Sequence, residues 1–179
     1  MKRNNFLILS VAILLFLNGC AGYKPIFGSN NIPFKISEHS IEGDRIIGNK
    51  IYSKLHNLSK SNNSENNIKT LNILINCSKV KEATSKATTG KILEYRLTVT
   101  AKINVLDYLN DEQVLNQTFN SSITYKVQDQ YSETIKLENR SMESLISKIY
   151  EELLIRLSEN ISLWWYLDLS KYKKIYQIF

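Results

Sequence analysis

The sequence predicts an α+β domain, a two-layer sandwich in which about four strands form a mixed sheet and two helices pack on one of its faces. Residues 93–105 place apolar side chains at every second position, which is typical of a half-buried strand. Residues 135–161 place them at helical spacing, and residues 47–58 do so over a shorter distance. The predicted order of elements is strand, helix, three strands, helix.

The first 19 residues are typical of a lipoprotein signal peptide. Lys2 and Arg3 precede an apolar run from Phe6 to Leu17, which is shorter than the roughly 20 residues of a membrane-spanning helix. The run ends in Leu-Asn-Gly-Cys, which resembles the bacterial lipobox, and Cys20 is therefore the predicted lipid-attachment residue. Its acyl chains would hold the protein to a membrane. A plain secretory signal with a chance cysteine and an uncleaved anchor are the alternatives.

Behind the signal peptide we expect three parts. Residues 20–31 form a lipidated tether, residues 32–161 the α/β domain, and residues 162–179 a tail rich in aromatic residues and lysines. The tail fits either a contact with lipid headgroups or a species-specific extension. The net charge of +6 falls to +4 once Lys2 and Arg3 are removed, which suits an anionic partner such as a phosphorylated lipid and argues against nucleic acid.

The first strand is expected over residues 32–40, and the helix after it begins at Asp44, a plausible N-cap. This helix could connect the first strand to a parallel neighbour. A loop over 59–67 precedes the three remaining strands, and Gly90 marks the turn that opens the second of them. The last two strands should form an antiparallel hairpin. The side chains predicted to face the helices are Leu71, Ile73, Ile75, Cys77, Leu93, Tyr95, Leu97, Val99, Ala101, Ile103, Val105, Leu115, Phe119, Ile123, Tyr125 and Val127.

The opposite face of the predicted sheet is polar but carries few charges. A freely solvated sheet face usually has more Lys and Glu, so this composition fits contact with another polar protein surface, such as the lumen wall of a β-barrel. Genome composition with ordinary solvent exposure explains it equally well. The residues concerned are Thr70, Asn72, Asn76, Ser78, Thr98, Thr100, Asn116, Thr118, Asn120, Ser122 and Thr124.

No catalytic or metal-binding pattern stands out in the sequence, so we expect a protein that is not an enzyme and needs no cofactor. His39 and His56 are isolated, and the chain has no H-x-x-x-H or C-x-x-C spacing. The segment Thr-Thr-Gly-Lys at residues 88–91 lacks the other residues of a phosphate-binding loop. Cys77 has no partner if Cys20 is acylated, and it fits a small core residue.

Four segments together resemble the alphaproteobacterial form of the LptE family of lipopolysaccharide-assembly lipoproteins. They are LNGCAGYKPIFG at residues 17–28, IIGNKIYSKLHNL at 46–58, EATSKATTGKILEYRLTVTAKINVLD at 82–107 and TYKVQDQYSETIKLENRSMESLISKIYEELLIRL at 124–157. The resemblance implies a lipid-anchored protein on the periplasmic side of the outer membrane. It also implies a complex with the β-barrel LptD that assembles lipopolysaccharide. Ala21 rather than Asp after the cysteine agrees with outer-membrane sorting.

The residues expected to bind lipopolysaccharide are physical candidates, because no lipid-binding motif of the family matches here position by position. Arg96, Lys102 and Lys126 should project from the polar sheet face, with Lys86 and Lys91 near its end. Such cations pair with phosphates, although each also fits ordinary solubilising charge. An accessory subunit of another envelope transport or secretion complex is the alternative function.

Overall fold

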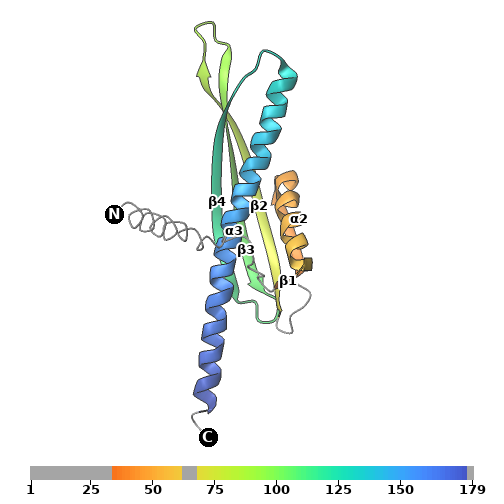
Figure 1. The fold of residues 1–179 in the computed structure, drawn as a ribbon, viewed down its shortest axis with the longest axis vertical. Helices are drawn as coiled ribbons and strands as arrows, with labels where there is room; N and C mark the ends of the chain where they lie inside the picture. Colours follow the sequence, from red (N-terminus) through yellow and green to blue (C-terminus); the bar gives the residue numbers. More distant parts are fainter. Residues whose placement is uncertain (1–33, 62–67, 177–179) are drawn as a thin grey trace, which may run out of the picture. The chain divides into compact units, whose positions relative to one another are not determined.

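The computed structural model describes residues 34–61 and 68–176, and it describes side chains for residues 34–60 and 68–161. The predicted signal peptide, Cys20 and the tether lie outside the described residues. The elements are β1 (Phe34–Gly43), α2 (Arg45–Ser61), β2 (Lys69–Lys86), β3 (Ile92–Asp107), β4 (Gln113–Lys126) and α3 (Tyr131–Tyr176) (Figure 1). The predicted order of elements is confirmed.

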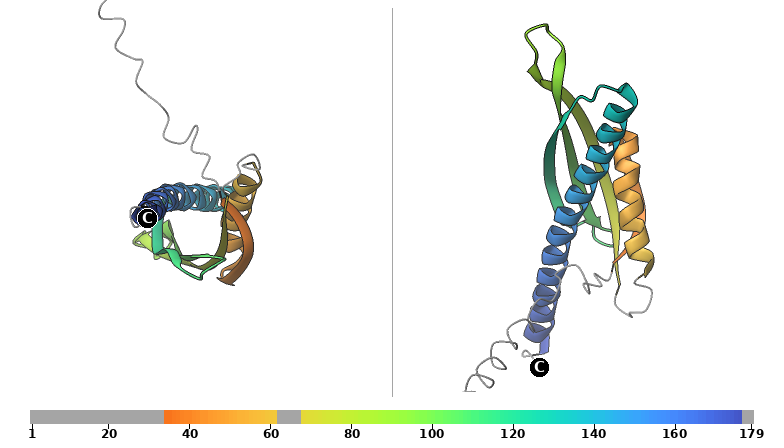
Figure 2. Two further views of the ribbon diagram at one scale, coloured as in Figure 1. Left: turned by 90° about the horizontal axis from the view of Figure 1, so that it is seen from below. Right: turned by 45° about the horizontal axis from the view of Figure 1, so that its top comes forward.

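The strands form one sheet in the order β1-β2-β3-β4. β1 runs parallel to β2, whereas β2, β3 and β4 are antiparallel to their neighbours. Two parallel neighbours need a crossover connection, and α2 provides it. Both helices cover the same face of the curved sheet (Figure 2), so the predicted two-layer α+β fold is confirmed.

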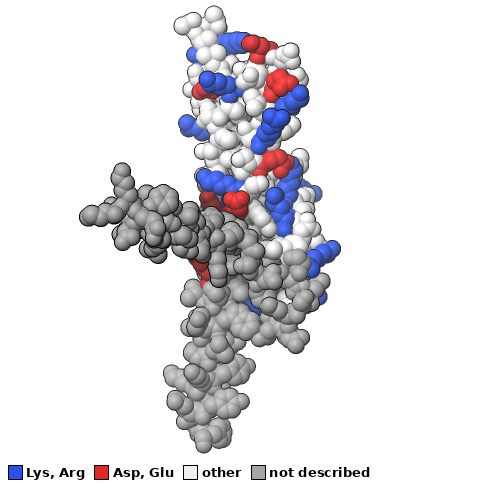
Figure 3. Space-filling view, viewed as in Figure 1, with Lys and Arg blue, Asp and Glu red and all other residues white. Residues whose placement is uncertain are grey.

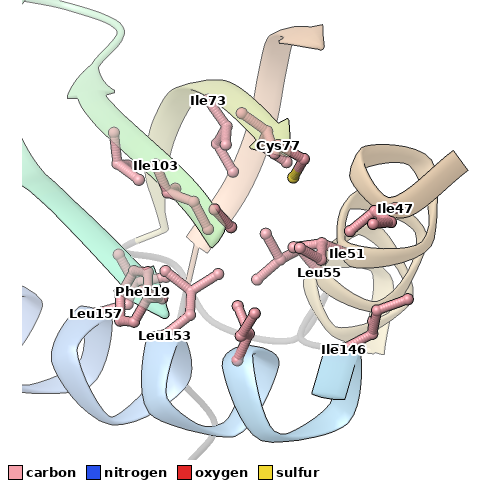
Figure 4. Close-up of a cluster of buried hydrophobic side chains, with 14 of the residues drawn as sticks. Ile47, Ile51, Leu55, Ile73, Cys77, Ile103, Phe119, Ile146, Leu153 and Leu157 are labelled. Carbon is pink, nitrogen blue, oxygen red and sulfur yellow. The ribbon is translucent and has the colours of Figure 1, made fainter. Parts of the chain in front are cut away.

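The core lies between this face and the two helices (Figure 4). α2 contributes Ile47, Ile51 and Leu55, and the sheet and α3 contribute the remaining side chains of the same apolar cluster. Fully burying one Leu or Ile side chain is worth roughly 1.5–3 kcal/mol, so this cluster is the main source of stability. Its strand and α3 members are Phe34, Leu71, Ile73, Ile75, Cys77, Leu97, Val99, Ala101, Ile103, Val105, Val114, Leu115, Phe119, Tyr125, Leu145, Ile146, Ile149, Leu153, Leu157 and Ile161.

The junction between β1 and α2 is fixed by three polar contacts. The Asp44 carboxylate accepts hydrogen bonds from the backbone N–H groups of Ile46 and Ile47, at 3.1 and 3.2 Å, as expected of an N-cap. The Asp44 N–H donates to the carbonyl of Cys77 on β2 at 2.7 Å. Gly43 turns the chain with a φ of +72°. β1 reaches Gly43, beyond the predicted end at residue 40, because it pairs with β2 as far as Cys77.

β2 and β3 extend beyond β1, and the tip of the hairpin that they form extends beyond the helices (Figures 1 and 2). We name residues 78–86 of β2 and 92–96 of β3 the distal arm, and residues 69–77 and 97–107 of the same strands the proximal half. Leu93 was predicted to face the core, but 42% of its surface is exposed, because the arm projects past the helices. The turn of the arm contains Gly90 with a φ of +84°, as the sequence predicted.

α3 is longer than the apolar periodicity of the sequence. Ile161 is its last residue described as part of the core, but the helical backbone continues to Tyr176. The first part of the predicted tail, residues 162–176, is therefore helical.

Candidate functional site

The face of the sheet turned away from the helices, here the outer sheet face, is the strongest candidate for a functional surface. Even-numbered residues of β2, β3 and β4 form it, and the strand register aligns them in rows across the sheet. The central row is Ser78, Thr100 and Asn120. The other rows are Leu74–Asn104–Asn116, Asn76–Lys102–Thr118, Val80–Thr98–Ser122 and Glu82–Arg96–Thr124.

These five rows contain only three charged residues, Lys102, Glu82 and Arg96. Leu74 and Val80 are exposed apolar side chains among them, at 42% and 48%. The side of the molecule on which α3 lies is more highly charged, and lysines, arginines and carboxylates are interspersed over it (Figure 3). There, Lys50 of α2 and Glu143 of α3 form an ion pair. These five rows of the outer sheet face are therefore sparsely charged, and the next row adds Glu94 and Lys126.

Two of the five predicted basic residues come close together. Lys126 lies opposite Glu94, and Arg96 lies opposite Thr124 in the next row of the same face. Diagonal neighbours of this kind have Cβ atoms about 7–8 Å apart. Glu82 on β2 is the other cross-strand neighbour of Arg96. The two cations are therefore flanked by two carboxylates, and the local charge is mixed.

Lys102 lies apart from that pair, in a groove of about 210 Å³ on the outer sheet face. It is six residues from Arg96 along β3, or roughly 20 Å at about 3.3 Å per residue. In the groove, Glu42 and Lys102 flank Asn76 in one row, and the Asn76 amide donates to the Glu42 carboxylate at 3.0 Å. Leu74, Ser40 and Asn104 line the next row. The groove thus presents one anion and one cation beside an apolar side chain.

The remaining two predicted residues lie at the end of the distal arm. Lys86 is opposite Ile92, after two register shifts in β2. Lys91 follows Gly90 in the turn, and both lysines are exposed. The structure therefore divides the five candidates into three places: Arg96 with Lys126, Lys102 by itself, and the tip of the arm.

The sequence analysis did not predict a polar cluster that lies on the helix side of the arm. Lys81 donates to the Glu138 carboxylate of α3 at 2.6 Å, and the Tyr125 hydroxyl donates to the same carboxylate at 3.0 Å. The Lys81 ammonium also lies 4.3 Å from the centre of the Tyr95 ring, within the range of a cation–π contact. Lys81 continues the odd-numbered series from Leu71 to Cys77, so its direction was predictable, whereas its partner on α3 was not.

The environment of this cluster shifts the pKa of all three groups. Burial lowers the pKa of Lys81, but its hydrogen bonds to Glu138 and Tyr125 outweigh burial and leave the pKa raised. The hydrogen bond from Lys81 lowers the pKa of Glu138, and burial raises that of Tyr125. The cluster therefore holds a charged Lys81–Glu138 pair at neutral pH, which joins the arm to the first turns of α3.

His39 and His56 both take part in ring stacking. The His39 ring stacks on Tyr52 at 3.8 Å, and Tyr52 stacks on His56 at 5.5 Å. Within the described ranges, no group of three or more His, Cys, Asp or Glu side chains is placed to hold a metal ion. Among the described helices, none combines the length and apolarity needed to cross a bilayer.

Cys77 is buried, and burial, with a smaller contribution from Asp44, raises its pKa to about 11.

The fold is similar to that of solved bacterial lipoproteins. The NMR structure of an uncharacterized lipoprotein B from Nitrosomonas europaea matches with a TM-score of 0.51 and 15% identity, over 74% of this chain and 90% of that one. Rare lipoprotein B from Shewanella oneidensis matches with a TM-score of 0.46 and 17% identity, over 71% and 98%. A minor lipoprotein from Acinetobacter baumannii matches with 0.49 and 13%, over 70% and 94%. No family model and no curated protein matches the sequence. The chain shares its fold with the Nitrosomonas protein.

Proposed function

We propose that this chain is an outer-membrane lipoprotein, anchored through an acylated Cys20 and facing the periplasm, that binds an LptD-type β-barrel and assists the assembly of lipopolysaccharide. In this proposal it acts by binding and catalyses no reaction. The outer sheet face is the observation that carries the proposal. The lipobox-like sequence at Cys20 and the fold shared with a lipoprotein B support it.

The composition of the outer sheet face fits a polar protein wall. Thr100 and Asn120, in its central row, offer hydroxyl and amide groups that both donate and accept hydrogen bonds. Burying such groups against another polar surface costs little if they find partners there, whereas burying unpaired charges costs much more. The face is therefore better suited to being covered than the charged helix side (Figure 3).

The first experiment identifies the partner. The tagged full-length chain is expressed in its host, membranes are solubilised gently, and the copurifying proteins are identified. We expect an LptD-type barrel. Reproducible recovery of an inner-membrane transporter without any barrel would contradict the proposal and favour an accessory subunit of another envelope complex.

A second experiment tests which face binds. A photo-crosslinking residue replaces Thr100 on the outer sheet face in one variant and the exposed Glu151 of α3 in a matched control. We expect a crosslink to the barrel from position 100 and little from position 151. Crosslinks from position 151 alone would move the interface to the helix side.

The lipid contacts are tested at two of the three places found in the structure. Arg96→Glu with Lys126→Glu changes the paired cations, and Lys102→Glu changes the groove. If Arg96 and Lys126 bind one lipid phosphate, their double variant should bind lipopolysaccharide about tenfold or more weakly in vitro. The Lys102 variant tests the groove separately. Unchanged affinity in both variants would remove all three residues from the site.

The anchor is tested separately. Cys20→Ser should abolish labelling with an alkyne fatty acid and release the chain from membranes, because acyl chains supply the attachment. Labelling that persists in this variant would rule out acylation at Cys20.

A further inference from the structure

The sheet has three free edges among the described residues, and only one of them is unprotected. They are β1, the part of β2 beyond Cys77, where β1 no longer pairs with it, and β4. An unpaired edge presents backbone N–H and C=O groups to any extended chain. Natural proteins therefore interrupt or charge such edges.

β1 and the free part of β2 carry these protective features. β1 has a register shift between Ile36 and Glu38, and Lys35, Glu38 and Glu42 add charges. The free part of β2 has register shifts on both sides of Ser85 and carries Lys79, Lys81, Glu82 and Lys86. Bulges and charges of this kind discourage further pairing.

β4 has none of these features over most of its length. Residues 114–125 contain no charged residue and no proline, and their register with β3 is continuous from Lys126 to Leu115. Within the part of the chain that the structure describes, no backbone hydrogen bond joins this stretch to any element other than β3. Figures 1 and 2 show β4 at one margin of the sheet, with α3 next to it on the helix side and no further strand paired with it.

The ladder shows which backbone groups face that free edge. The Val127 N–H donates to the Leu93 carbonyl, so the odd-numbered residues of β4 and β3 form the hydrogen-bonded pairs of this antiparallel ladder. The even-numbered residues of β4 are then in the non-hydrogen-bonded pairs, and their N–H and C=O groups point away from β3. Residues 116, 118, 120, 122 and 124 therefore supply the free edge, and all five are exposed.

We propose that β4 pairs antiparallel with β4 of a second copy of this chain, about a two-fold axis at Asn120. This register places Thr118 opposite Ser122 and Asn116 opposite Thr124 of the other copy. It also keeps the core-facing and outer-facing residues of the two strands on matching sides, as an extended sheet requires.

The sequence of β4 supports a second copy as the occupant. A two-fold interface at Asn120 brings each residue of β4 opposite another position of the same strand in the second copy, so a charge in this stretch would need an opposite charge at the matching position. β4 needs no such match over residues 114–125, because its first charged residue is Lys126, which falls opposite Val114 in this register. The core side chains Leu115, Phe119 and Tyr125 hold the strand in place, so its edge is presented in one fixed register. The result is a continuous sheet across two chains.

Charge variants test this register. The full chain is purified in mild detergent, and its mass is measured by light scattering over a concentration series. We expect the mass of two copies. Thr118→Lys with Ser122→Lys places lysine opposite lysine twice and should raise the dissociation constant about tenfold or more. Thr118→Lys with Ser122→Glu places lysine opposite glutamate twice and should restore the dimer. A monomer for the unchanged chain at every concentration, or equal dimerisation of all three proteins, would overturn the proposal.

A backbone variant provides an independent measurement. Asn120→Pro removes an N–H that faces the free edge without removing a hydrogen bond to β3, and proline is tolerated at such positions. It should abolish the dimer, whereas Asn120→Ala, which keeps the N–H, should retain it. Circular dichroism of both variants shows whether each has folded. A folded proline variant that still dimerises would overturn the proposal. If the proline variant does not fold, the charge variants decide.

This dimer and the proposed barrel complex are tested by separate measurements. The dimer is read from the mass of the purified chain alone, and the barrel from copurification in the host. Failure of one therefore does not imply failure of the other.

Discussion

The proximal half and the distal arm are parts of the same two strands, β2 and β3, but different interactions hold them. In the proximal half, Ile73 and Ile103 are fully buried beneath both helices (Figure 4). In the arm, Val80 and Leu93 are 48% and 42% exposed, Tyr95 is only partly buried, and the Lys81–Glu138 ion pair adds a link to α3. Burial of apolar area is the larger source of free energy. The proximal half should therefore set global stability, and the arm should open locally.

Truncation of an aliphatic side chain in each region should give the largest contrast. Ile103→Ala removes a fully buried side chain and should lower the free energy of unfolding by about 2–5 kcal/mol. Leu93→Ala, its control on the same side of β3 but in the arm, should change it by about 0.5–1 kcal/mol or less. Urea unfolding followed by circular dichroism measures both. Equal losses would mean that the arm is part of the core.

A pair of glycine variants makes the same comparison through the backbone. Gly43 and Gly90 both have positive φ, at +72° and +84°, and alanine there should cost about 1–2 kcal/mol. A Cβ at residue 43 would also collide with the Cys77 carbonyl, whereas a Cβ at residue 90 meets no atom within 4 Å.

Gly43→Ala should therefore be the more destabilising of the two, because the Cys77 carbonyl accepts the bond from Asp44 that joins β1 to β2. Thermal unfolding of the two variants gives the difference. If both lose the same amount, the collision is relieved by a small backbone movement, and only the φ preference remains.

Loss of the Lys81–Glu138 pair should have a smaller and more local effect. Glu138→Gln removes the charge of the shared acceptor and should cost about 0.5–1.5 kcal/mol. The loss should appear as faster amide hydrogen exchange in residues 78–86 and 92–96, with little change around Ile103. The matched variant Glu143→Gln removes the α2–α3 ion pair instead and should leave exchange in the arm unchanged.

The same pair predicts how the arm responds to pH. The pKa of Glu138 is lowered by folding from an ordinary value of 4.5, so its contribution is complete above pH 4.5 and is lost as the pH falls through the folded value. The pKa of Lys81 is raised from 10.5, so its contribution is present below pH 10.5 and is lost as the pH rises further.

Hydrogen exchange in the arm, corrected for its intrinsic pH dependence, should therefore quicken at both extremes. If exchange in the arm still quickens at low pH in the Glu138→Gln variant, groups other than Glu138 cause the acid effect.

Much of the fold follows directly from the sequence. The alternation from Leu97 to Val105 fixed which side of β3 faces the helices, since successive strand residues point in opposite directions. The apolar spacing from Ile135 to Ile161 identified α3, and Asp44 identified the start of α2. Strand and helix periods depend on residues that are neighbours along the chain, so they can be predicted from a single sequence.

The candidate site was only partly predictable. Membership of the outer sheet face followed from alternation, but the grouping of its basic residues depended on strand register. Arg96 is close to Lys126 because the β3–β4 ladder places them in neighbouring rows, whereas its distance from Lys102 follows from their six-residue separation on β3. The groove around Lys102 also depends on β1, since Glu42 reaches it only through the parallel pairing with β2.

The sequence by itself determined the order of elements, the two faces of the sheet and the expected lipid attachment at Cys20. The tertiary structure decided where β1 stops, and therefore where β2 becomes a free edge. It decided which partner Lys81 finds on α3 and which strand is left with an unprotected edge. The physical reason is that periodicity depends on neighbours along the chain, whereas register, burial and edge exposure depend on residues brought together from distant parts of it.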